Sequence, residues 1–389
     1  MLDPRALRPH YTAFLRDDRV LLTGHSHQAW PDVARAGMVE AFDDAARLVD
    51  DKWGRAFEAA DDVREAVARI LGADKDEIAL GQNTHELVVR FLSALDLAGR
   101  PRLVTTRGEF HSITRQLLRL EEDGRVQVTW IDPAPVETLA TRLAAAVDGR
   151  TSAVLASTVL FETAQIVPGT AALVRAAREE GAHVLLDAYH GFNVVPATLA
   201  SLGAADAFVV GGGYKYAEWG EGVCFLRVPA AGLALRPVLT GWFAGFAGLG
   251  ARQDSVAWGE LGKDLFAGAT YDPTGHYRAR RVARFMQAQG MTPAALRELS
   301  LRQTGRILAG LDGLGLGPDV CTPRDPDARG GFVAVRVQGG DVAEVVRSLR
   351  ARGILVDARG DLVRLGPAPY VTDEEIDRGI TALREILRR

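Results

Sequence analysis

Helical and strand-like hydrophobic patterns alternate through the first two thirds of the chain. Apolar residues recur with helical spacing over residues 32–49, 57–71, 86–97, 111–122, 136–147 and 170–180. Short apolar runs typical of buried strands cover residues 77–80, 102–105, 126–130, 152–157, a run that ends at Asp187, 207–210 and 223–228. This alternation predicts an α/β fold in which a mostly parallel sheet carries helices on both faces.

The pattern changes from about residue 261. A long helical region, 277–311, contains the helix breakers Gly290 and Pro293. It is followed by predicted strands and helices at 331–338, 342–351, 354–356, 362–365 and 373–387. We therefore expect an N-terminal segment (1–30), a large domain (31–260) and a smaller α+β C-terminal domain (261–389), against which the N-terminal segment packs.

The composition is that of an ordinary globular protein. Of the 389 residues, 47% are hydrophobic, and the formal net charge is −4, so nothing favours nucleic acid or an anionic membrane as a partner. No apolar run reaches the roughly 18 residues of a membrane span, and residues 1–10 lack the apolar core of a signal peptide. Two cysteines cannot form a disulfide framework, which predicts a cytoplasmic location.

An acid and a lysine carry the strongest chemical signal. Asp187 ends one apolar run, and Lys215 follows a second run that ends in three glycines. Pyridoxal phosphate (PLP) chemistry needs this pair, because a lysine amine forms the Schiff base and an acid keeps the pyridine nitrogen protonated. A strand-end acid and a loop lysine are each common alone. Their order, together with His190 three residues after the acid, favours the PLP interpretation.

Four segments carry a resemblance to a known family: Asp187-Ala-Tyr-His190, Gly213-Tyr-Lys-Tyr216, Gly241-Trp-Phe243 and Arg364-Leu-Gly-Pro-Ala-Pro-Tyr370. The chain resembles the fold-type-I PLP enzymes of the class V aminotransferase group, and most of all the kynureninases. This resemblance implies a large domain with a mostly parallel seven-stranded sheet and a smaller C-terminal domain.

The resemblance also implies roles for individual residues. Lys215 is expected to bind PLP and to move the Cα proton, Asp187 to pair with the pyridine nitrogen, and His190 and Tyr214 to assist beside the cofactor. Arg364 and Ser26 are expected on the substrate side, where a planar guanidinium can grip a carboxylate with two hydrogen bonds. Further cofactor contacts are expected from Thr84, His85, Phe110, Ser112, Trp242 and Thr270.

The expected phosphate contact of Thr84 and the expected roles of Trp242 and Thr270 depend on how the chain folds and assembles. Residues 81–86 form a turn that opens a helix, and backbone amides at a helix N-terminus cradle a phosphate, although a capping box also places Thr at such a position. Trp242 and Thr270 are expected to act from the neighbouring subunit, so the resemblance implies a homodimer with shared active sites.

The implied reaction is hydrolysis of the Cβ–Cγ bond of L-kynurenine, or of a related substrate, to L-alanine and anthranilate. The chain departs from the kynureninase pattern on the substrate side. His25 and His27 stand in a segment that reads Gly-Asn-Ser-Leu in the family, and Ile113 replaces an Asp. The two histidines either line a pocket for a polar or anionic substrate or are ordinary loop residues. A relative with altered specificity fits this pattern at least as well as a true kynureninase.

Other functions remain open. A class V aminotransferase, epimerase or lyase would use Lys215, Asp187 and Arg364 in the same way. A cysteine desulfurase needs a cysteine in the loop before Arg364, and residues 353–364 contain none. A PLP-binding regulator would need an appended DNA-binding module, which the sequence lacks. The eight histidines show no metal-ligand spacing, so no metal is expected.

Overall fold

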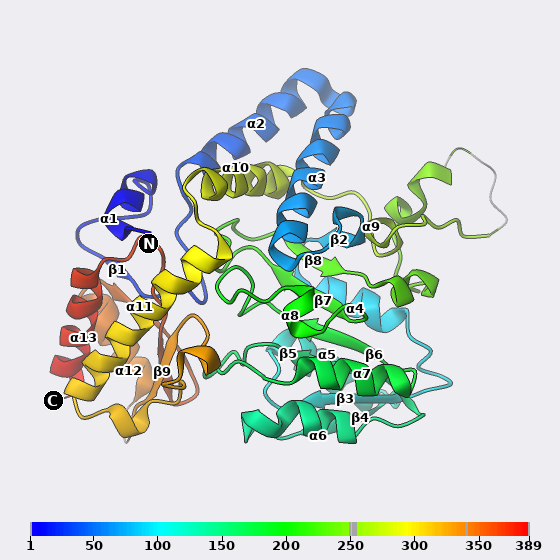
Figure 1. The fold of residues 1–389 in the computed structure, drawn as a ribbon. Coiled ribbons are helices and arrows are strands. Elements are labelled where there is room, and N and C mark those ends of the chain that lie inside the picture. The colour runs from blue at the N-terminus through cyan, green and yellow to red at the C-terminus, as the bar shows by residue number, and fades with distance from the viewer. Residues whose placement is uncertain (1, 249, 251–254, 339–340, 388–389) are drawn as a thin grey trace.

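The computed structural model describes residues 2–248, 250, 255–338 and 341–387. A seven-stranded sheet forms its centre (Figure 1). In spatial order its strands are β2 (Ile78–Gly81), β8 (Cys224–Arg227), β7 (Phe208–Gly212), β6 (His183–Asp187), β5 (Thr151–Ser157), β3 (Arg102–Thr106) and β4 (Gln127–Ile131). Neighbours pair in parallel except around β8, which runs antiparallel to β2 and β7. The predicted α/β fold with a mostly parallel sheet is confirmed.

The central strands are buried on both faces, which explains why they read as continuous apolar runs. Every residue of β5 is buried. Successive residues point to opposite faces: Val154 belongs to one hydrophobic cluster and Leu155 to another, and Leu186 and Leu185 divide in the same way. The sheet therefore separates two cores, and helices cover both of them.

Different helices supply the two cores. Helices α4 (Thr84–Ser93) and α5 (His111–Glu122) pack on one face, whereas α3 (Lys52–Leu71), α6 (Leu139–Ala145) and α7 (Thr170–Glu179) pack on the other. Helix α4 begins two residues earlier than the pattern predicts, because Asn83 caps it by accepting the Glu86 N–H at 2.8 Å. Helix α3 likewise begins at residue 52, where Trp53 adds to a small apolar cluster with Ala56.

The C-terminal part has its own sheet and helices. The predicted breaks are confirmed: α10 (Thr274–Ala288) and α11 (Pro293–Gly313) are separated by Gly290, whose φ is +66°, and by Pro293. Helix α10 packs against α2 (Val33–Leu48) and α3, whereas α11 packs against α13 (Asp373–Leu387). An antiparallel sheet contains β11 (Asp357–Arg359), β12 (Leu362–Leu365) and β9 (Val333–Arg336) in this order.

The N-terminal segment joins the C-terminal part. Strand β1 (Val20–Leu21) pairs in parallel with β10 (Ile354–Leu355). Figure 1 shows β1 close to α13. A buried hydrogen bond also ties this segment to the loop after Lys215, because the Tyr11 hydroxyl donates to Glu218 at 2.6 Å. The division into segments 1–30, 31–260 and 261–389 stays a prediction.

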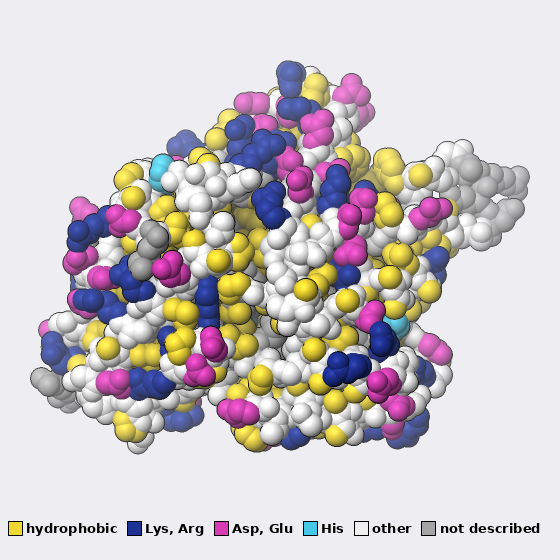
Figure 2. All heavy atoms as spheres, in the orientation of Figure 1, with side chains coloured by type: hydrophobic (Ala, Val, Ile, Leu, Met, Phe, Trp, Pro, Cys, Tyr) yellow, Lys and Arg dark blue, Asp and Glu magenta, His cyan; other side chains and the backbone are white. Residues whose placement is uncertain are grey.

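The remaining helices are α1 (Pro4–Leu7), α8 (Leu199–Leu202), α9 (Gly262–Leu265) and α12 (Val342–Ala351). Across the described residues, the helices are all too short or too polar to span a membrane. On the face drawn in Figure 2, basic and acidic side chains are interspersed, in keeping with the small net charge.

Candidate active site

Four of the predicted cofactor residues meet at one edge of the seven-stranded sheet. Asp187 ends β6, Lys215 follows β7, Phe110 follows β3, and Thr84 follows β2. These four strands run in the same direction, so their carboxyl ends lie at the same edge. In open α/β sheets this edge is where ligands bind.

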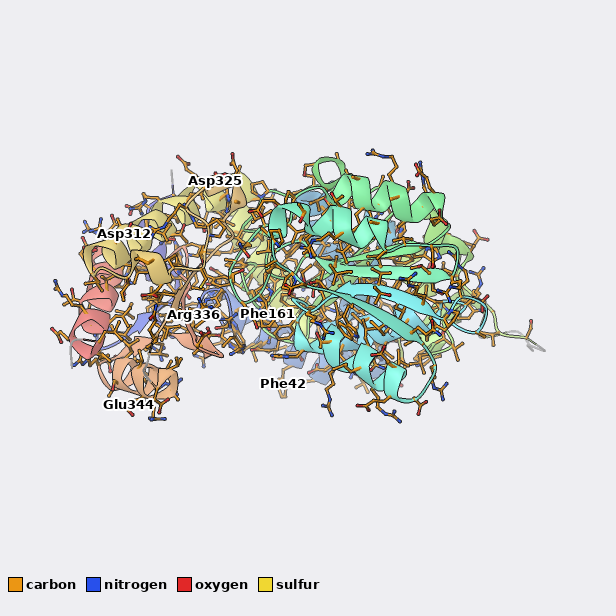
Figure 3. All side chains as sticks on the ribbon, turned by 90° about the horizontal axis from the view of Figure 1, so that it is seen from below. Phe42, Phe161, Asp312, Asp325, Arg336 and Glu344 are labelled. Carbon is orange, nitrogen blue, oxygen red and sulfur yellow. The ribbon has the colours of Figure 1, made fainter. Side chains whose placement is uncertain are left out.

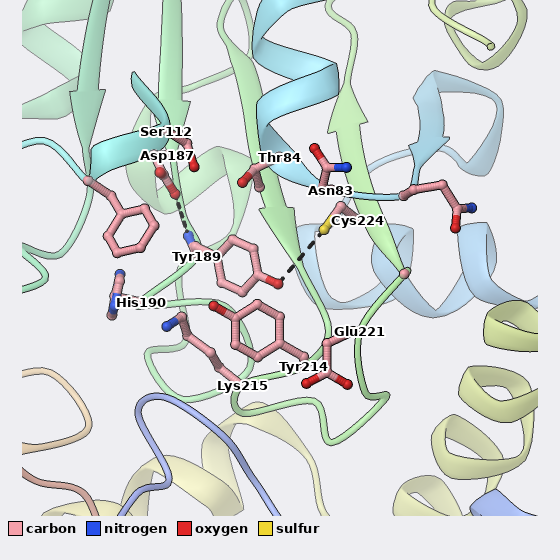
Figure 4. A pocket seen from close by; sticks show the side chains of 13 residues that line it. Asn83, Thr84, Ser112, Asp187, Tyr189, His190, Tyr214, Lys215, Glu221 and Cys224 are labelled. Carbon is pink, nitrogen blue, oxygen red and sulfur yellow. Dashed lines mark hydrogen bonds between the residues drawn. The ribbon is translucent and has the colours of Figure 1, made fainter. Parts of the chain in front are cut away.

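A cavity of about 230 Å³ opens at this edge (Figure 4). In Figure 4 the side chains of Asp187, His190, Tyr214 and Lys215 converge on it. Its lining consists of Gln82, Asn83, Thr84, Phe110, Ser112, Asp187, Tyr189, His190, Tyr214, Lys215, Glu221, Gly222 and Cys224. The structure thus brings seven of the residues predicted from the sequence into one cavity.

Lys215 is buried among aromatic rings. Its Nζ donates a hydrogen bond to the His25 carbonyl oxygen at 3.0 Å and lies 4.9 Å from the Tyr214 ring centre and 5.4 Å from that of Tyr189. Burial, reinforced by the positive charge of Arg364, lowers the pKa of Lys215 to about 7. A large share of this lysine is therefore the uncharged amine near neutral pH, which is the form that attacks a carbonyl.

Asp187 faces the same cavity from the end of β6. One carboxylate oxygen accepts the Tyr189 N–H at 2.8 Å. Burial raises the pKa of Asp187 to about 6, and the Tyr189 N–H and Lys215 oppose this rise. The carboxylate would be stabilised further by a cationic ring nitrogen, so this position suits an acid that pairs with a protonated heterocycle.

A second carboxyl group, Glu109, lies beneath the site and was given no role in the sequence analysis. It is buried and accepts hydrogen bonds from the Ser157 N–H at 2.9 Å and the Ser157 hydroxyl at 2.6 Å. Burial raises the pKa of Glu109 to about 8, and the nearby Asp187 adds to the effect. Glu109 is therefore mostly neutral at pH 7, which leaves Asp187 as the ionised member of this pair. In the sequence, only its position directly before the predicted site residue Phe110 could have indicated that Glu109 lies near the site.

The N-terminus of α4 forms another wall. Thr84 lines the cavity, and the first turn of α4 points its amides to this side, where a helix dipole favours an anion. His85 lies instead on a neighbouring open groove, together with His111 and Arg115. Ser112 lines both spaces, so the cavity and the groove adjoin.

Aromatic rings close the opposite wall. The Phe110 ring centre lies 5.9 Å from Lys215 Nζ and 6.1 Å from the His190 ring centre. His190 is buried, and burial lowers its pKa well below the usual value, so the ring is neutral near pH 7. A neutral imidazole can still donate one hydrogen bond to a ligand.

Besides His85, four predicted residues lie outside the cavity of this chain: Ser26, Trp242, Thr270 and Arg364. Trp242 is 45% exposed, and its Nε1 donates to the Thr270 hydroxyl at 3.3 Å. Ser26 donates to the Thr23 carbonyl oxygen at 3.1 Å. Arg364 is buried and is held by Asp357.

Several lining residues had no role in the sequence analysis. Tyr189 stands between two predicted site residues, so its position was the signal. Gln82 and Asn83 belong to the predicted turn before α4. Glu221 and Cys224 come from the turn into β8, whose antiparallel direction brings its first residue to the same edge. The apolar run of β8 alone gave no hint of this direction.

These features fit PLP. The cavity offers a buried amine, an acid at a strand end, helix amides and a flat aromatic side chain, which match an aldehyde, a pyridine nitrogen, a phosphate and a planar ring. The residues that would hold the cofactor are Lys215, Asp187, Thr84 and Phe110.

Comparison with known proteins points to the same cofactor. The sequence model of the family described as aminotransferase class-V matches residues 41–378. A kynureninase from Salinispora tropica is 31% identical over 339 residues, which cover 81% of this chain and 77% of the relative. A kynureninase from Xanthomonas oryzae is 27% identical over 90% of this chain and 87% of the relative. An isopenicillin N epimerase from Streptomyces clavuligerus is 28% identical over 82% of both chains.

Solved structures show the same fold at lower identity. A cysteine desulfurase from Thermococcus onnurineus superposes with a TM-score of 0.83 at 20% identity, over 100% of this chain and 99% of the other. A cystine C–S lyase in complex with cysteine persulfide gives 0.82 at 19% identity, over 96% and 99%. With the family model matching most of its length, the chain belongs to the aminotransferase class-V family of PLP-dependent enzymes.

Proposed function

We propose that this enzyme hydrolyses the Cβ–Cγ bond of L-kynurenine, or of a closely related amino acid, to L-alanine and anthranilate. One observation carries the proposal. Lys215 and Asp187 face one cavity in a chain that aligns with kynureninases over 81% to 90% of its length.

The residues around the cavity divide the work. Bound PLP supplies an electron sink for the negative charge that develops at Cα. Lys215 holds the cofactor and moves the Cα proton, a task that suits its pKa of about 7. Burial raises the pKa of Tyr214 to about 12, so its phenol stays protonated and can donate a hydrogen bond to a developing oxyanion. Neutral His190 is proposed to orient the substrate beside it.

Arg364 is proposed to bind the substrate α-carboxylate. Of its five N–H groups, one on Nε and one on Nη2 bind Asp357, and one on Nη1 binds the Phe161 carbonyl oxygen. One N–H on each Nη atom remains for a ligand, and two such groups match the two oxygens of a carboxylate. Ser26, in the same segment as His25, is proposed to line the substrate side.

An aminotransferase or epimerase is the second candidate. The observation in its favour is the isopenicillin N epimerase relative, which is nearly as similar as the kynureninases. Such an enzyme would use the same lysine, acid and arginine, and it would differ in what happens after the Cα proton leaves.

A desulfurase is less well supported. Cys224 lines the cavity, but burial raises the pKa of its thiol to about 12, which disfavours the thiolate that such a reaction needs. Cys321 is half-buried, and burial raises its pKa as well. The fold similarity to a desulfurase therefore does not extend to its nucleophile.

A homodimer is part of the proposal, as is a cytoplasmic location, which rests on the two cysteines. Trp242, Phe246 and Val256 expose 45%, 49% and 64% of their surfaces, and a second copy would cover such an apolar region. Trp242 and Thr270 would then reach the partner's cofactor phosphate.

Product analysis tests the reaction. Purified PLP-loaded protein is mixed with L-kynurenine and, separately, with 3-hydroxy-L-kynurenine. Equal amounts of alanine and the matching anthranilate are expected. If neither forms and the cofactor is converted to pyridoxamine phosphate by another amino acid, the enzyme is an aminotransferase. Conversion of an amino acid to its Cα epimer, with exchange of the Cα hydrogen for solvent hydrogen, would indicate an epimerase.

A further inference from the structure

His25, in the N-terminal segment, contacts both Lys215 and the Asp357–Arg364 pair. Its backbone carbonyl accepts the hydrogen bond from Lys215 Nζ at 3.0 Å. Its ring is fully buried, and Nε2 lies 2.7 Å from Oδ1 of Asp357. His25 therefore stands between the lysine and the cluster that contains Arg364.

Asp357 holds Arg364 in a defined orientation. The two residues are cross-strand partners in the β11–β12 pair. Arg364 Nε donates to Oδ1 of Asp357 at 2.9 Å and Nη2 donates to Oδ2 at 2.5 Å, a geometry that fixes the plane of the guanidinium. Arg364 Nη1 also donates to the carbonyl oxygen of Phe161, which lies where the C-terminal part meets the large sheet (Figure 3).

The charges of the neighbouring groups determine the protonation state in which His25 binds Asp357. Burial lowers the pKa of His25 to about 4, and this effect exceeds the opposing pull of Asp357. Burial alone would raise the pKa of Asp357, but its bonds to His25 and Arg364 hold it far below the usual range. Because Arg364 already neutralises the carboxylate, a second positive charge is not needed. A neutral His25 must carry its proton on Nε2 in order to donate to Asp357.

The packing around the ring leaves His25 little freedom. The ring stacks on Phe332 with the centres 4.6 Å apart. A Cβ atom on Gly366 would collide with Nδ1, so a glycine at this position leaves room for the ring. Nδ1 has no hydrogen-bond partner among the described residues. The single bond from Nε2 to Asp357 is thus the polar anchor of the side chain.

We propose that His25 is a positioning residue for recognition of the substrate α-carboxylate. By donating to Asp357, it fixes the carboxylate that in turn orients Arg364 relative to Lys215, so that the remaining N–H groups of Arg364 face the substrate. This inference rests on the proposed role of Arg364. It assigns one of the two histidines that distinguish this chain from kynureninases to specificity for amino acids over amines and amides.

His27 provides a matched control in the same segment. Its side chain is 72% exposed, and its nearest charged partner is Glu221 at 3.8 Å. Its ring lies against Tyr214 with the centres 5.5 Å apart, and it has no contact with the Asp357–Arg364 pair among those the structure describes. A change at His27 therefore tests proximity to the site without the link to Arg364.

Binding of L-alanine and of L-alaninamide to the holoprotein tests the proposal. The two probes share the amine and differ in the carboxylate, and the dissociation constants come from the change in the visible absorbance of the bound cofactor. Wild type is expected to prefer L-alanine. His25→Leu should weaken L-alanine binding by about 10-fold and leave L-alaninamide within about 2-fold, because only the carboxylate contact depends on Arg364. His25→Gln, whose amide can donate to Asp357, and His27→Gln should keep the preference.

Three results would overturn the proposal. The first is a preference for L-alanine that survives in His25→Leu, and the second is equal weakening of both probes. The third is a wild type that does not distinguish the probes, which would remove the role of Arg364 as well. If His25→Leu gives no folded holoprotein, His25→Asn is used, because its shorter amide cannot span the distance to Asp357. Neither probe has a γ-carbonyl, so the result does not depend on whether kynurenine is the substrate.

Discussion

The two sides of the candidate active site are built in opposite ways. The cofactor side is an open cavity formed by the ends of neighbouring strands, and Lys215 and Asp187 face it with perturbed pKa values. The proposed substrate side, formed by His25, Asp357 and Arg364, is closed, and its charged groups already bind one another. The titratable groups of the first side line an open cavity, whereas the charged groups of the second side pair with one another. Changes to the first should therefore affect the reaction itself, and changes to the second should affect binding.

The largest effect is expected for Lys215→Ala. Without the amine, the covalent link to the cofactor and the proton transfer at Cα are both lost, so activity should fall by about 10⁴-fold or more. The visible absorbance of the linked cofactor should vanish. Lys263→Ala is the control, because Lys263 pairs with Asp76 away from the cavity. Persistence of the absorbance in Lys215→Ala would mean that another lysine binds the cofactor.

A smaller loss is expected for Asp187→Asn. The amide has nearly the same shape but cannot stabilise a protonated ring nitrogen, so kcat should fall by about 10²- to 10³-fold while the cofactor stays bound. Steady-state kinetics and cofactor content are the measurements. Asp206→Asn is the control, since Asp206 pairs with exposed Arg178. An unchanged kcat in Asp187→Asn would show that the reaction does not depend on the Asp187 carboxylate.

The substrate side should respond through KM. Arg364→Lys keeps the positive charge but loses the bidentate grip and the fixed plane, so KM for the amino acid should rise by about 10- to 100-fold with a smaller change in kcat. Initial rates over a range of substrate concentrations measure the split. A fall in kcat at unchanged KM would contradict the division between the two sides.

The smallest expected effect is a shift along the pH axis. Lys215 must lose its proton before it can bind PLP, and its pKa is lowered from 10.5 to about 7. The uncharged fraction therefore rises as the pH increases through about 7, and so should the rate at which the apoprotein recaptures PLP, with a plateau about one unit higher. A rate that keeps rising towards pH 10 would show that burial does not act on this lysine.

The cofactor side was largely predictable from the sequence, and the reason is its local construction. Asp187 and Lys215 each end a recognisable apolar run, and the parallel arrangement places such ends together. The proposed substrate side also depends on a contact that no local pattern contains, because His25 and Asp357 are 332 positions apart in the chain. Strand β11, which holds Asp357, is three residues long and polar at both ends, so hydrophobic periodicity could not reveal it.

Two further features of the site depend on burial and could not be predicted from the sequence. Glu109 reads as an ordinary acid before an aromatic residue, and its protonated state follows from its burial and from the nearby charge of Asp187. Arg364 was expected from its motif, but its bond to Phe161 joins residues 203 positions apart. Such states depend on the three-dimensional surroundings and not on residue type.

The pairing of β1 with β10 sets an order of events during synthesis. Residues 20–21 leave the ribosome early, yet their partners at 354–355 are made near the end. All seven strands of the large sheet precede residue 228. That sheet can therefore assemble before β10 has been made and before β1 can pair with it. The His25 carbonyl reaches Lys215 only when this segment has docked. A nascent chain that ends before β10 is therefore expected to hold the cavity without the proposed substrate side.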